Sequence, residues 1–153
     1  MNDYKLEHVL SYSGTLAAPP ETIGPLPEGI RVNFYSTGGE ITGPGISGVL
    51  RPVGGDWMLV RTDGVGLLDV RTTFELHDGA LILVTYTGLV DLGVDGYEMF
   101  LRGELPSKVQ LRTTPRFQTS HPAYLWLNRL HCIGIGEYNA AANVAHYDVY
   151  SVR

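Results

Sequence analysis

The sequence predicts an all-β protein whose strands form a single antiparallel barrel. Short β-prone segments recur at even spacing, and the Asp-Gly and Gly-Gly pairs between them are typical of tight turns. These segments do not alternate with long helical patterns, which disfavours parallel α/β folds. The alternative is a sandwich, but closing a barrel removes the edges that strands rich in Val, Ile and Tyr would expose. A chain of 153 residues fits one domain, and we expect residues 1–153 to form it.

In residues 1–62, alternating residues and turn signals define four strands. We expect them over residues 3–13, 30–35, 45–50 and 57–62. Four of the nine prolines lie in residues 14–29. Because Pro cannot donate a hydrogen bond to a sheet, we expect a loop there. Residues 36–44 and 52–56 are rich in Gly and Pro, which predicts turns.

The clearest pattern is the alternation in residues 68–76. Apolar and polar side chains alternate there with a period of two, which predicts a strand with two different faces. One face carries Leu68, Val70, Thr72, Phe74 and Leu76, and the other carries Asp69, Arg71, Thr73 and Glu75. A polar strand face usually meets water, so the first interpretation is an outer surface with an ion pair. The second is that this polar face lines a cavity inside the barrel.

The second half of the chain predicts five more strands and one helical turn. We expect the strands over residues 80–89, 97–102, 106–114, 127–135 and 144–152. Ser120 can cap the helical turn, and Pro122 suits its first positions. Gly-containing turns are expected at residues 77–79 and 91–96.

Composition and charge narrow the range of partners. The net charge is −5 and no run of Lys or Arg occurs, so nucleic acid is not an expected partner. No apolar run approaches the ~20 residues that span a bilayer, and the N-terminal residues lack the apolar core of a secretion signal. The single cysteine, Cys132, excludes an internal disulfide and suits a reducing compartment. We therefore expect a cytoplasmic protein that does not bind membranes.

Several linked motifs resemble one protein family. They are, in order, Gly54-Gly-Asp-Trp57, Leu68-Asp-Val-Arg71, Pro115-Arg-Phe-Gln-Thr119 and Tyr124-Leu-Trp-Leu-Asn128. With them the sequence resembles the DUF3237 family, also labelled UPF0311, over nearly its whole length. The resemblance implies a compact, calycin-like β-barrel but no particular reaction. One departure is Gln118, which stands where the family usually has Glu and cannot ionise.

The resemblance makes Asp69 and Arg71 the first candidates for catalysis. An acid–base pair that recurs on one strand face suggests that both side chains point into the barrel and meet one ligand. Arg71 offers a planar fork for a carbonyl or carboxylate oxygen, and Asp69 would move the proton. His146, or His131 on the neighbouring strand, would be the acid–base partner. The structural alternatives are an Asp that orients the Arg, and imidazoles that face water or the core.

Other residues are candidates for the substrate pocket. Trp57, Phe117 and Trp126 would shape its apolar walls, and the amide of Asn128 would hydrogen-bond a polar substrate. Asp56 follows a Gly-Gly pair and is most simply a turn carboxylate that caps backbone amides. In the functional interpretation, Trp57 raises the pKa of a nearby carboxyl by excluding water. The structural alternative for the aromatic residues is packing in the core.

The sequence contains no motif for a metal or a nucleotide cofactor. The five histidines form no His-x-His or His-x-x-x-His pair, and Cys132 has no second cysteine. No Gly-x-Ser-x-Gly elbow occurs, and Gly134-x-Gly136 precedes no phosphate-binding helix. We therefore expect neither metal nor cofactor.

These observations leave three functional hypotheses. The first is a cofactor-independent enzyme of the lyase, isomerase or cyclase type, with acid–base chemistry on a small carbonyl- or carboxylate-bearing substrate. The second is a non-catalytic barrel that binds a small ligand. The third is an assembly module whose exposed strands pair between subunits, as in a homodimer. A second ionisable group facing the first across the cavity would favour the enzyme.

Overall fold

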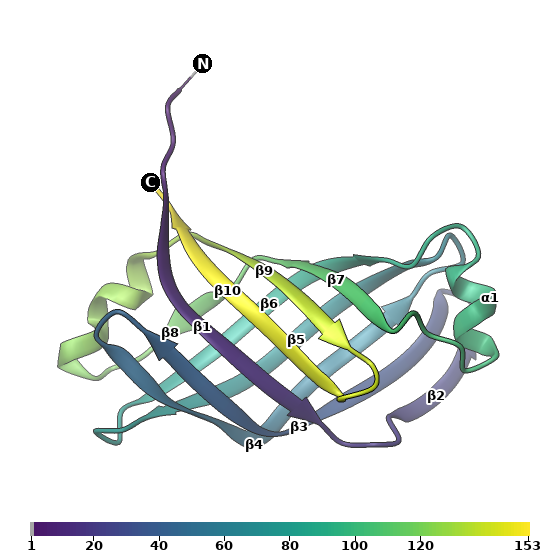
Figure 1. The fold of residues 1–153 in the computed structure, drawn as a ribbon, viewed down its shortest axis with the longest axis horizontal. Coiled ribbons are helices and arrows are strands. Elements are labelled where there is room, and N and C mark those ends of the chain that lie inside the picture. Colours follow the sequence, from purple (N-terminus) through teal and green to yellow (C-terminus); the bar gives the residue numbers. More distant parts are fainter. Residues whose placement is uncertain (1) are drawn as a thin grey trace.

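A computed structural model describes residues 2–153, which form ten strands and two short helices (Figure 1). The strands are β1 (Leu6–Leu16), β2 (Glu21–Leu26), β3 (Gly29–Gly43), β4 (Ile46–Val60), β5 (Val65–Leu76), β6 (Leu81–Asp91), β7 (Lys108–Thr113), β8 (Arg116–Gln118), β9 (Cys132–Asn139) and β10 (Val144–Val152). The helices are α1 (Gly96–Leu101) and the 3-10 helix η1 (Pro122–Arg129), which lie at opposite ends of the molecule. Within residues 2–153, neither helix has the length and apolar character needed to cross a membrane.

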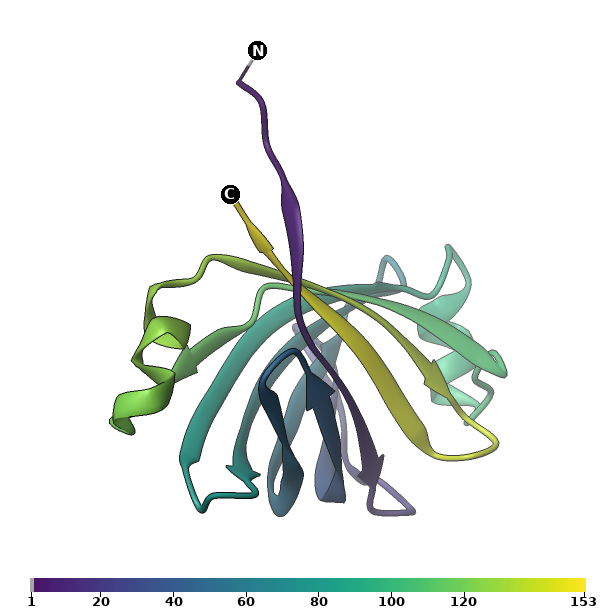
Figure 2. The ribbon, with the colours of Figure 1, turned by 60° about the vertical axis from the view of Figure 1, so that its left-hand side comes forward.

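Eight of the strands close a ring, which confirms the predicted antiparallel barrel (Figure 2). Their order is β1-β10-β9-β7-β6-β5-β4-β3, and β3 pairs again with β1. The other two strands add to this ring, since β2 pairs with β3 and β8 pairs with β6. The first and last ring strands are joined along their length, and Lys5 and Arg153 exchange two backbone hydrogen bonds of 2.7 and 2.9 Å.

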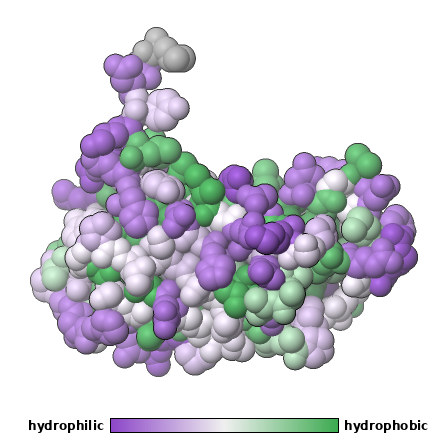
Figure 3. All heavy atoms as spheres, viewed as in Figure 1, coloured by the Kyte–Doolittle hydropathy of each residue, from purple (hydrophilic) through white to green (hydrophobic). Residues whose placement is uncertain are grey.

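The alternation predicted for residues 68–76 is confirmed in β5. Every second side chain from Leu68 to Leu76 is buried, and the residues between them are partly or fully exposed. The period of two therefore assigns one complete set of side chains to the barrel interior. On the outside, hydrophilic and hydrophobic groups are interspersed, as the face in Figure 3 shows.

The strand predicted over residues 97–102 is wrong, because α1 occupies this segment. Tyr97 and Phe100 are both partly buried and pack against the core. A spacing of three places two side chains on one face of a helix but on opposite faces of a strand. The β propensity of Tyr and Phe was therefore overridden by the packing of this one face.

The turn predicted over residues 36–44 is present only at its end, where Pro44 and Gly45 join β3 to β4. Residues 36–43 and the turn predicted over residues 52–56 are instead irregular parts of these long strands. The β3–β4 register shifts between Tyr35 and Gly39, and the β4–β5 register shifts between Leu50 and Gly54. At Gly39 an added Cβ would lie 1.8 Å from the carbonyl oxygen of Ser13. This glycine marks a close approach of two strands rather than a reversal of the chain.

The predicted helical turn is present but begins later and extends further. His121, not Ser120, precedes η1, and its Nδ1 accepts the N–H of Ala123 at 3.4 Å. The residue before a proline favours an extended backbone, so Pro122 fixes the start of the helix. Because η1 continues to Arg129, β9 begins at Cys132 rather than at residue 127. The loop predicted over residues 14–29 contains the end of β1 and all of β2.

The η1 end of the barrel is filled with side chains. Phe74, Ile82 and Leu127 are fully buried there, and Phe117 is 3% exposed. The Phe74 and Phe117 rings pack with centroids 6.4 Å apart. Dense apolar packing closes this end, which leaves the interior space at the other end of the barrel.

Candidate functional site

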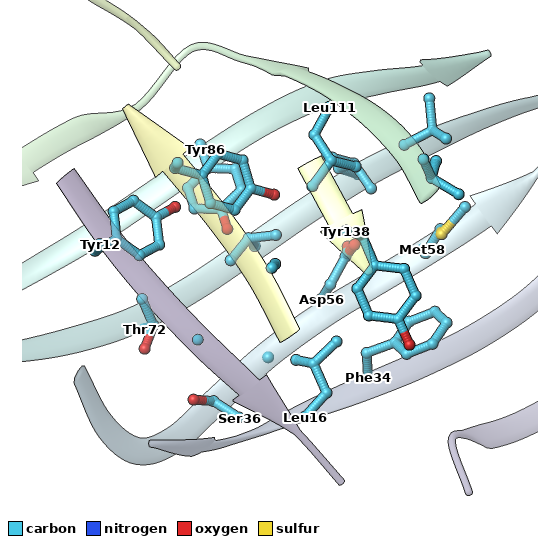
Figure 4. Close-up of a pocket in the computed structure, with 18 of the residues that line it drawn as sticks. Tyr12, Leu16, Phe34, Ser36, Asp56, Met58, Thr72, Tyr86, Leu111 and Tyr138 are labelled. Carbon is cyan, nitrogen blue, oxygen red and sulfur yellow. The ribbon is translucent and has the colours of Figure 1, made fainter. Parts of the chain in front are cut away.

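A cavity of about 110 Å³ lies inside the barrel, and each of the eight ring strands contributes to its wall (Figure 4). The wall is mostly apolar, with side chains such as Leu50, Met58, Val70 and Leu111. The polar side chains are few. They are Tyr12, Ser36, Asp56, Thr72, Tyr86, Tyr138 and Tyr147.

The mouth of the cavity lies towards α1. Leu92, Phe100 and Leu105, from the segment between β6 and β7, line it and are partly or largely exposed. Tyr138 of β9 also lines the cavity, and its hydroxyl donates to Asn143 Oδ1 at 2.8 Å. Asn143 Nδ2 donates to the carbonyl oxygen of Leu16 at 2.6 Å, which ties the β9–β10 turn to the end of β1.

Asp56 is the one carboxyl group among the described residues that line the cavity. It lies on the inward face of β4 together with Met58 and Val60, as the period of two requires. Its Oδ1 accepts the backbone N–H of Asp69 at 2.9 Å. The preceding Gly55 permits a close strand approach, because an added Cβ would lie 2.2 Å from the carbonyl oxygen of Phe34.

Burial raises the pKa of Asp56 to about 7. The negative charge of Asp69 also raises this pKa, whereas the Asp69 N–H and the positive charge of Arg31 oppose the increase. Arg31 lies on β3, and its Nη1 donates to the carbonyl oxygen of Trp57 at 2.6 Å. The carboxyl group therefore changes its protonation state near neutral pH, where a group can both accept and donate a proton.

Three buried tyrosines form a cluster on the cavity wall. Tyr12 stacks on Tyr147 with ring centroids 4.9 Å apart, and Tyr86 lies 5.8 Å from Tyr147. Burial raises the pKa of Tyr86 to about 12, with a contribution from the nearby charge of Asp56. Burial likewise holds the pKa values of Tyr12 and Tyr147 well above the ordinary range. These hydroxyls stay protonated at neutral pH and can donate hydrogen bonds to a ligand oxygen.

The prediction that Asp69 and Arg71 point into the barrel is wrong. Both side chains lie outside, 49% and 58% exposed, with Arg71 Nη1 3.0 Å from Asp69 Oδ1. The Arg71 guanidinium also lies 5.9 Å from the centroid of the Trp57 ring. Alternation in β5 allows only one of its two faces to point inward, and burying the apolar set avoids desolvating two charges.

The other predicted substrate-binding residues lie away from the cavity wall. Trp57 faces outward and packs edge-on against Tyr35, with ring centroids 6.5 Å apart. Phe117 belongs to the filled end. In η1, Trp126 is 41% exposed, and the Asn128 side chain bonds the backbone N–H and carbonyl oxygen of Thr119, each at 2.8 Å.

The predicted acid–base partners are also on the outside. His131 and His146 are both exposed, and His146 lies in a groove on the outer surface that β1, β3, β7, β9 and β10 line. Gln118 is exposed as well. Of the nine residues proposed from the sequence, Asp56 is therefore the one that lines the cavity.

The sequence reasoning missed the tyrosine cluster. The period of two in their strands could have predicted that these side chains point inward, since Tyr12, Tyr86 and Tyr147 occupy buried positions of β1, β6 and β10. No group of three His, Cys, Asp or Glu side chains in residues 2–153 is arranged to hold a metal ion. The groups available for chemistry in the cavity are thus a carboxyl and several hydroxyls.

Fold and cavity together define a class of protein: a small closed antiparallel β-barrel with an apolar interior cavity that contains one carboxyl group. The chain belongs to the family described as Protein of unknown function (DUF3237), whose sequence model matches residues 4–152.

Relatives of known sequence and structure agree with this assignment. UPF0311 protein RPA1785 of Rhodopseudomonas palustris is 35% identical over 113 residues, which are 72% of this chain and 74% of the relative. A crystal structure of RPA1785, described as a conserved protein of unknown function, covers 100% of both chains with a TM-score of 0.87 and 28% identity.

Two further solved structures share the fold. A β-barrel like protein from Acinetobacter baumannii (ABAYE2633) has a TM-score of 0.83 and 27% identity, covering 100% of this chain and 98% of that chain. A structure described as an enzyme from Penicillium herquei has a TM-score of 0.69 and 24% identity, covering 99% and 97% of the two chains. At that identity the likeness concerns the fold alone.

Proposed function

We propose that this protein is a cofactor-independent acid–base enzyme of the lyase, isomerase or cyclase type, and that Asp56 transfers the proton. The observation that carries the proposal is a single carboxyl group with a pKa of about 7 in an apolar cavity. A catalytic acid or base is most effective when its pKa lies near the working pH. A perturbed pKa inside a cavity is also a recognised mark of a functional site.

The tyrosine cluster supports the same chemistry. Removing a proton next to a carbonyl group places negative charge on the carbonyl oxygen. Hydroxyl donors that face this oxygen in a water-poor cavity stabilise the charge as it develops. Tyr86 and Tyr147 are the candidates for this role, since the charge of Asp56 acts on both phenols and all three side chains line one cavity.

The wall chemistry favours an uncharged substrate. Among the described residues that line the cavity there is no Lys, Arg or His, so an anionic group would find no counter-charge there. An ionised Asp56 would also repel it. The substrate is therefore better described as carbonyl-bearing than as carboxylate-bearing, because Arg71, the residue expected to clamp a carboxylate, lies outside.

The second candidate is a non-catalytic barrel that binds a small apolar ligand. The predominance of apolar side chains in the wall favours it, because carriage needs only a matching shape. It is also favoured because the described lining residues place no second carboxyl group and no His opposite Asp56. The two functions differ in what Asp56 does. An enzyme needs its carboxylate form to remove a proton, whereas a carrier needs no proton transfer.

Proton transfer can be measured without the natural substrate. We would follow deuterium incorporation next to the carbonyl group of cyclohexanone and 4-tert-butylcyclohexanone in D₂O by NMR. The protein should accelerate exchange of at least one ketone, with a rate that rises with pH around a midpoint near 7. Asp56→Asn keeps the shape of the side chain but removes the base, so the acceleration should fall by about 10²- to 10⁴-fold.

Glu75→Gln is the matched control, since it makes the same change to a carboxylate on the outward face of β5 that does not act on Asp56. It should retain exchange within a few-fold of the wild-type rate. If neither ketone exchanges faster with the wild-type protein than with Asp56→Asn, the enzyme proposal fails. The carrier then becomes the better description.

A further inference from the structure

Gly14 is the least crowded glycine on the cavity wall. It lies near the end of β1, on the inward face between Tyr12 and Leu16. Its partners in the two neighbouring strands are also small, Ala145 in β10 and Gly39 in β3.

The backbone does not require a glycine at this position. An added Cβ at Gly39 or Gly55 would lie 1.8 or 2.2 Å from a carbonyl oxygen, so those two glycines are needed for close strand packing. At Gly14 the one atom found within 4 Å of an added Cβ is Leu50 Cδ1 at 3.5 Å, an ordinary van der Waals distance. Its φ angle also lies outside the left-handed region that favours glycine.

A glycine inside a strand has a cost that something else must offset. It gains no side-chain packing and loses more conformational freedom on folding than other residues, so its presence marks a bulge, a bend, or a close approach by another backbone or a ligand. The β1–β3 register shifts next to Gly14, between Thr15 and Leu16, but the space for a Cβ shows that neither this shift nor a neighbouring backbone excludes a side chain at Gly14. Here the space above Gly14 opens into the cavity, and Ala145 beside it also lines the wall. The two residues form a notch between the stacked Tyr12 and Tyr147 rings and Leu16, and the Leu50 side chain faces Gly14 across it.

We propose that Gly14 is a specificity-determining residue whose missing side chain admits a branched substituent on the ring of an uncharged cyclic ketone. That the ligand carries a carbonyl group rests on the proposed function. The role of the notch depends only on the size of the ligand. The cavity of about 110 Å³ is smaller than the dry cavity of ~150 Å³ that holds a benzene ring. A substituted ring therefore fills it and extends towards the mouth, and the volume of one side chain decides which ligands fit.

Binding of two ketones tests the notch. Dissociation constants of cyclohexanone and 4-tert-butylcyclohexanone would be measured by ligand-observed NMR for the wild type, Gly14→Ala and Gly14→Val. The wild type should prefer the substituted ketone. Gly14→Val should weaken binding of that ketone at least tenfold and change cyclohexanone less than threefold, with Gly14→Ala between the two.

Ser13→Val is the matched control, since it places the same side chain on the outward face of the same strand. It should leave both dissociation constants unchanged. Melting temperatures of all variants show whether the barrel is intact, and Gly14→Ala keeps the test decisive if Gly14→Val does not fold.

Three results would each overturn the inference: a wild type that does not bind the substituted ketone more tightly, Gly14 variants that weaken both ketones equally, or a Ser13→Val protein that loses the preference as well. Deuterium exchange is a separate readout. If the notch inference is wrong, exchange still depends on Asp56; if the proposed function is wrong, size selection can persist without exchange.

Discussion

One end of the barrel is filled with side chains, and the other end is hollow. Towards η1, β5 contributes Phe74, which is fully buried and lies 5.2 Å from the Tyr12 ring. Towards α1, the same strand contributes Leu68 and Val70 to the wall of a cavity. The pairing of β5 with β6 continues through both ends, so the ends differ in the side chains that reach the interior, among them Phe117 of β8 and Leu127 of η1 at the filled end.

This difference separates stability from chemistry. Close packing at the filled end supplies the dispersion contacts and apolar burial that hold a domain together. The hollow end forgoes part of that packing and contains a carboxyl group whose burial destabilises its charged form. Substitutions at the two ends should therefore have effects of different size and different pH dependence.

The largest effect is expected at the filled end. Phe74→Ala should lower the free energy of unfolding by about 3–5 kcal/mol, because it leaves a void among fully buried neighbours. Urea denaturation measures the loss. The control is Leu83→Ala on the outer face of β6, where the side chain is 43% exposed and the loss should be much smaller. Equal losses would mean that the packing difference between inside and outside is not what stabilises the barrel.

The next effect belongs to the hollow end and depends on pH. The pKa of Asp56 rises from 3.8 to about 7 on folding, so the folded state keeps a proton that the unfolded chain releases. The contribution of this bound proton to the free energy of unfolding is fully present below about pH 4. It is lost as the pH rises towards and through 7. At 1.36 kcal/mol for each unit of pKa, the loss amounts to about 4 kcal/mol at most.

Asp56→Asn should remove this pH-dependent loss. The unfolding free energies of wild type and Asp56→Asn, measured by urea denaturation between pH 4 and 8, should diverge steadily with the variant becoming relatively more stable. Glu75→Gln, which changes an outward side chain of β5, is the control. It should leave the pH dependence of the unfolding free energy as in the wild type. A constant difference between wild type and Asp56→Asn would show that Asp56 titrates normally in the folded state.

The smallest effect tests the cavity wall directly. Met58 borders existing empty space, so Met58→Ala enlarges a cavity instead of creating one. We expect a loss of about 2 kcal/mol, at the low end for large-to-small changes in a core. Urea denaturation alongside Phe74→Ala gives the comparison. A Met58→Ala loss as large as that of Phe74→Ala would contradict the division of the barrel into filled and hollow ends.

The sequence predicted the barrel well because strand alternation is a local property. The two faces of β5 follow from nine consecutive residues, residues 68–76, and the structure reproduces both. Which face meets the cavity is not local, since it depends on how eight strands close. The interpretation that placed Asp69 and Arg71 inside failed at this step.

Asp56 illustrates the opposite case. Its local context, a Gly-Gly pair followed by Asp-Trp, is typical of a turn. The simplest interpretation of the sequence is therefore a turn carboxylate rather than one that lines a cavity. The structure continues β4 through this segment, and the spacing from Asp56 to Met58 and Val60 then sets its inward direction. Two close approaches explain the glycines in the middle of this strand: an added Cβ at Gly54 would meet the Arg71 carbonyl oxygen of β5, and one at Gly55 would meet the Phe34 carbonyl oxygen of β3.

The pairing of the first and last ring strands has a consequence for the order of folding. The stacked rings of Tyr12 and Tyr147 come from β1 and β10, so this part of the cavity wall joins segments that are far apart along the chain. Contacts of such long sequence separation form against a large loop-closure entropy and slow the folding of β proteins. Hairpins such as β5–β6 can form from neighbouring segments, but the tyrosine pair exists only after β1 and β10 have met. The cavity is thus a product of ring closure.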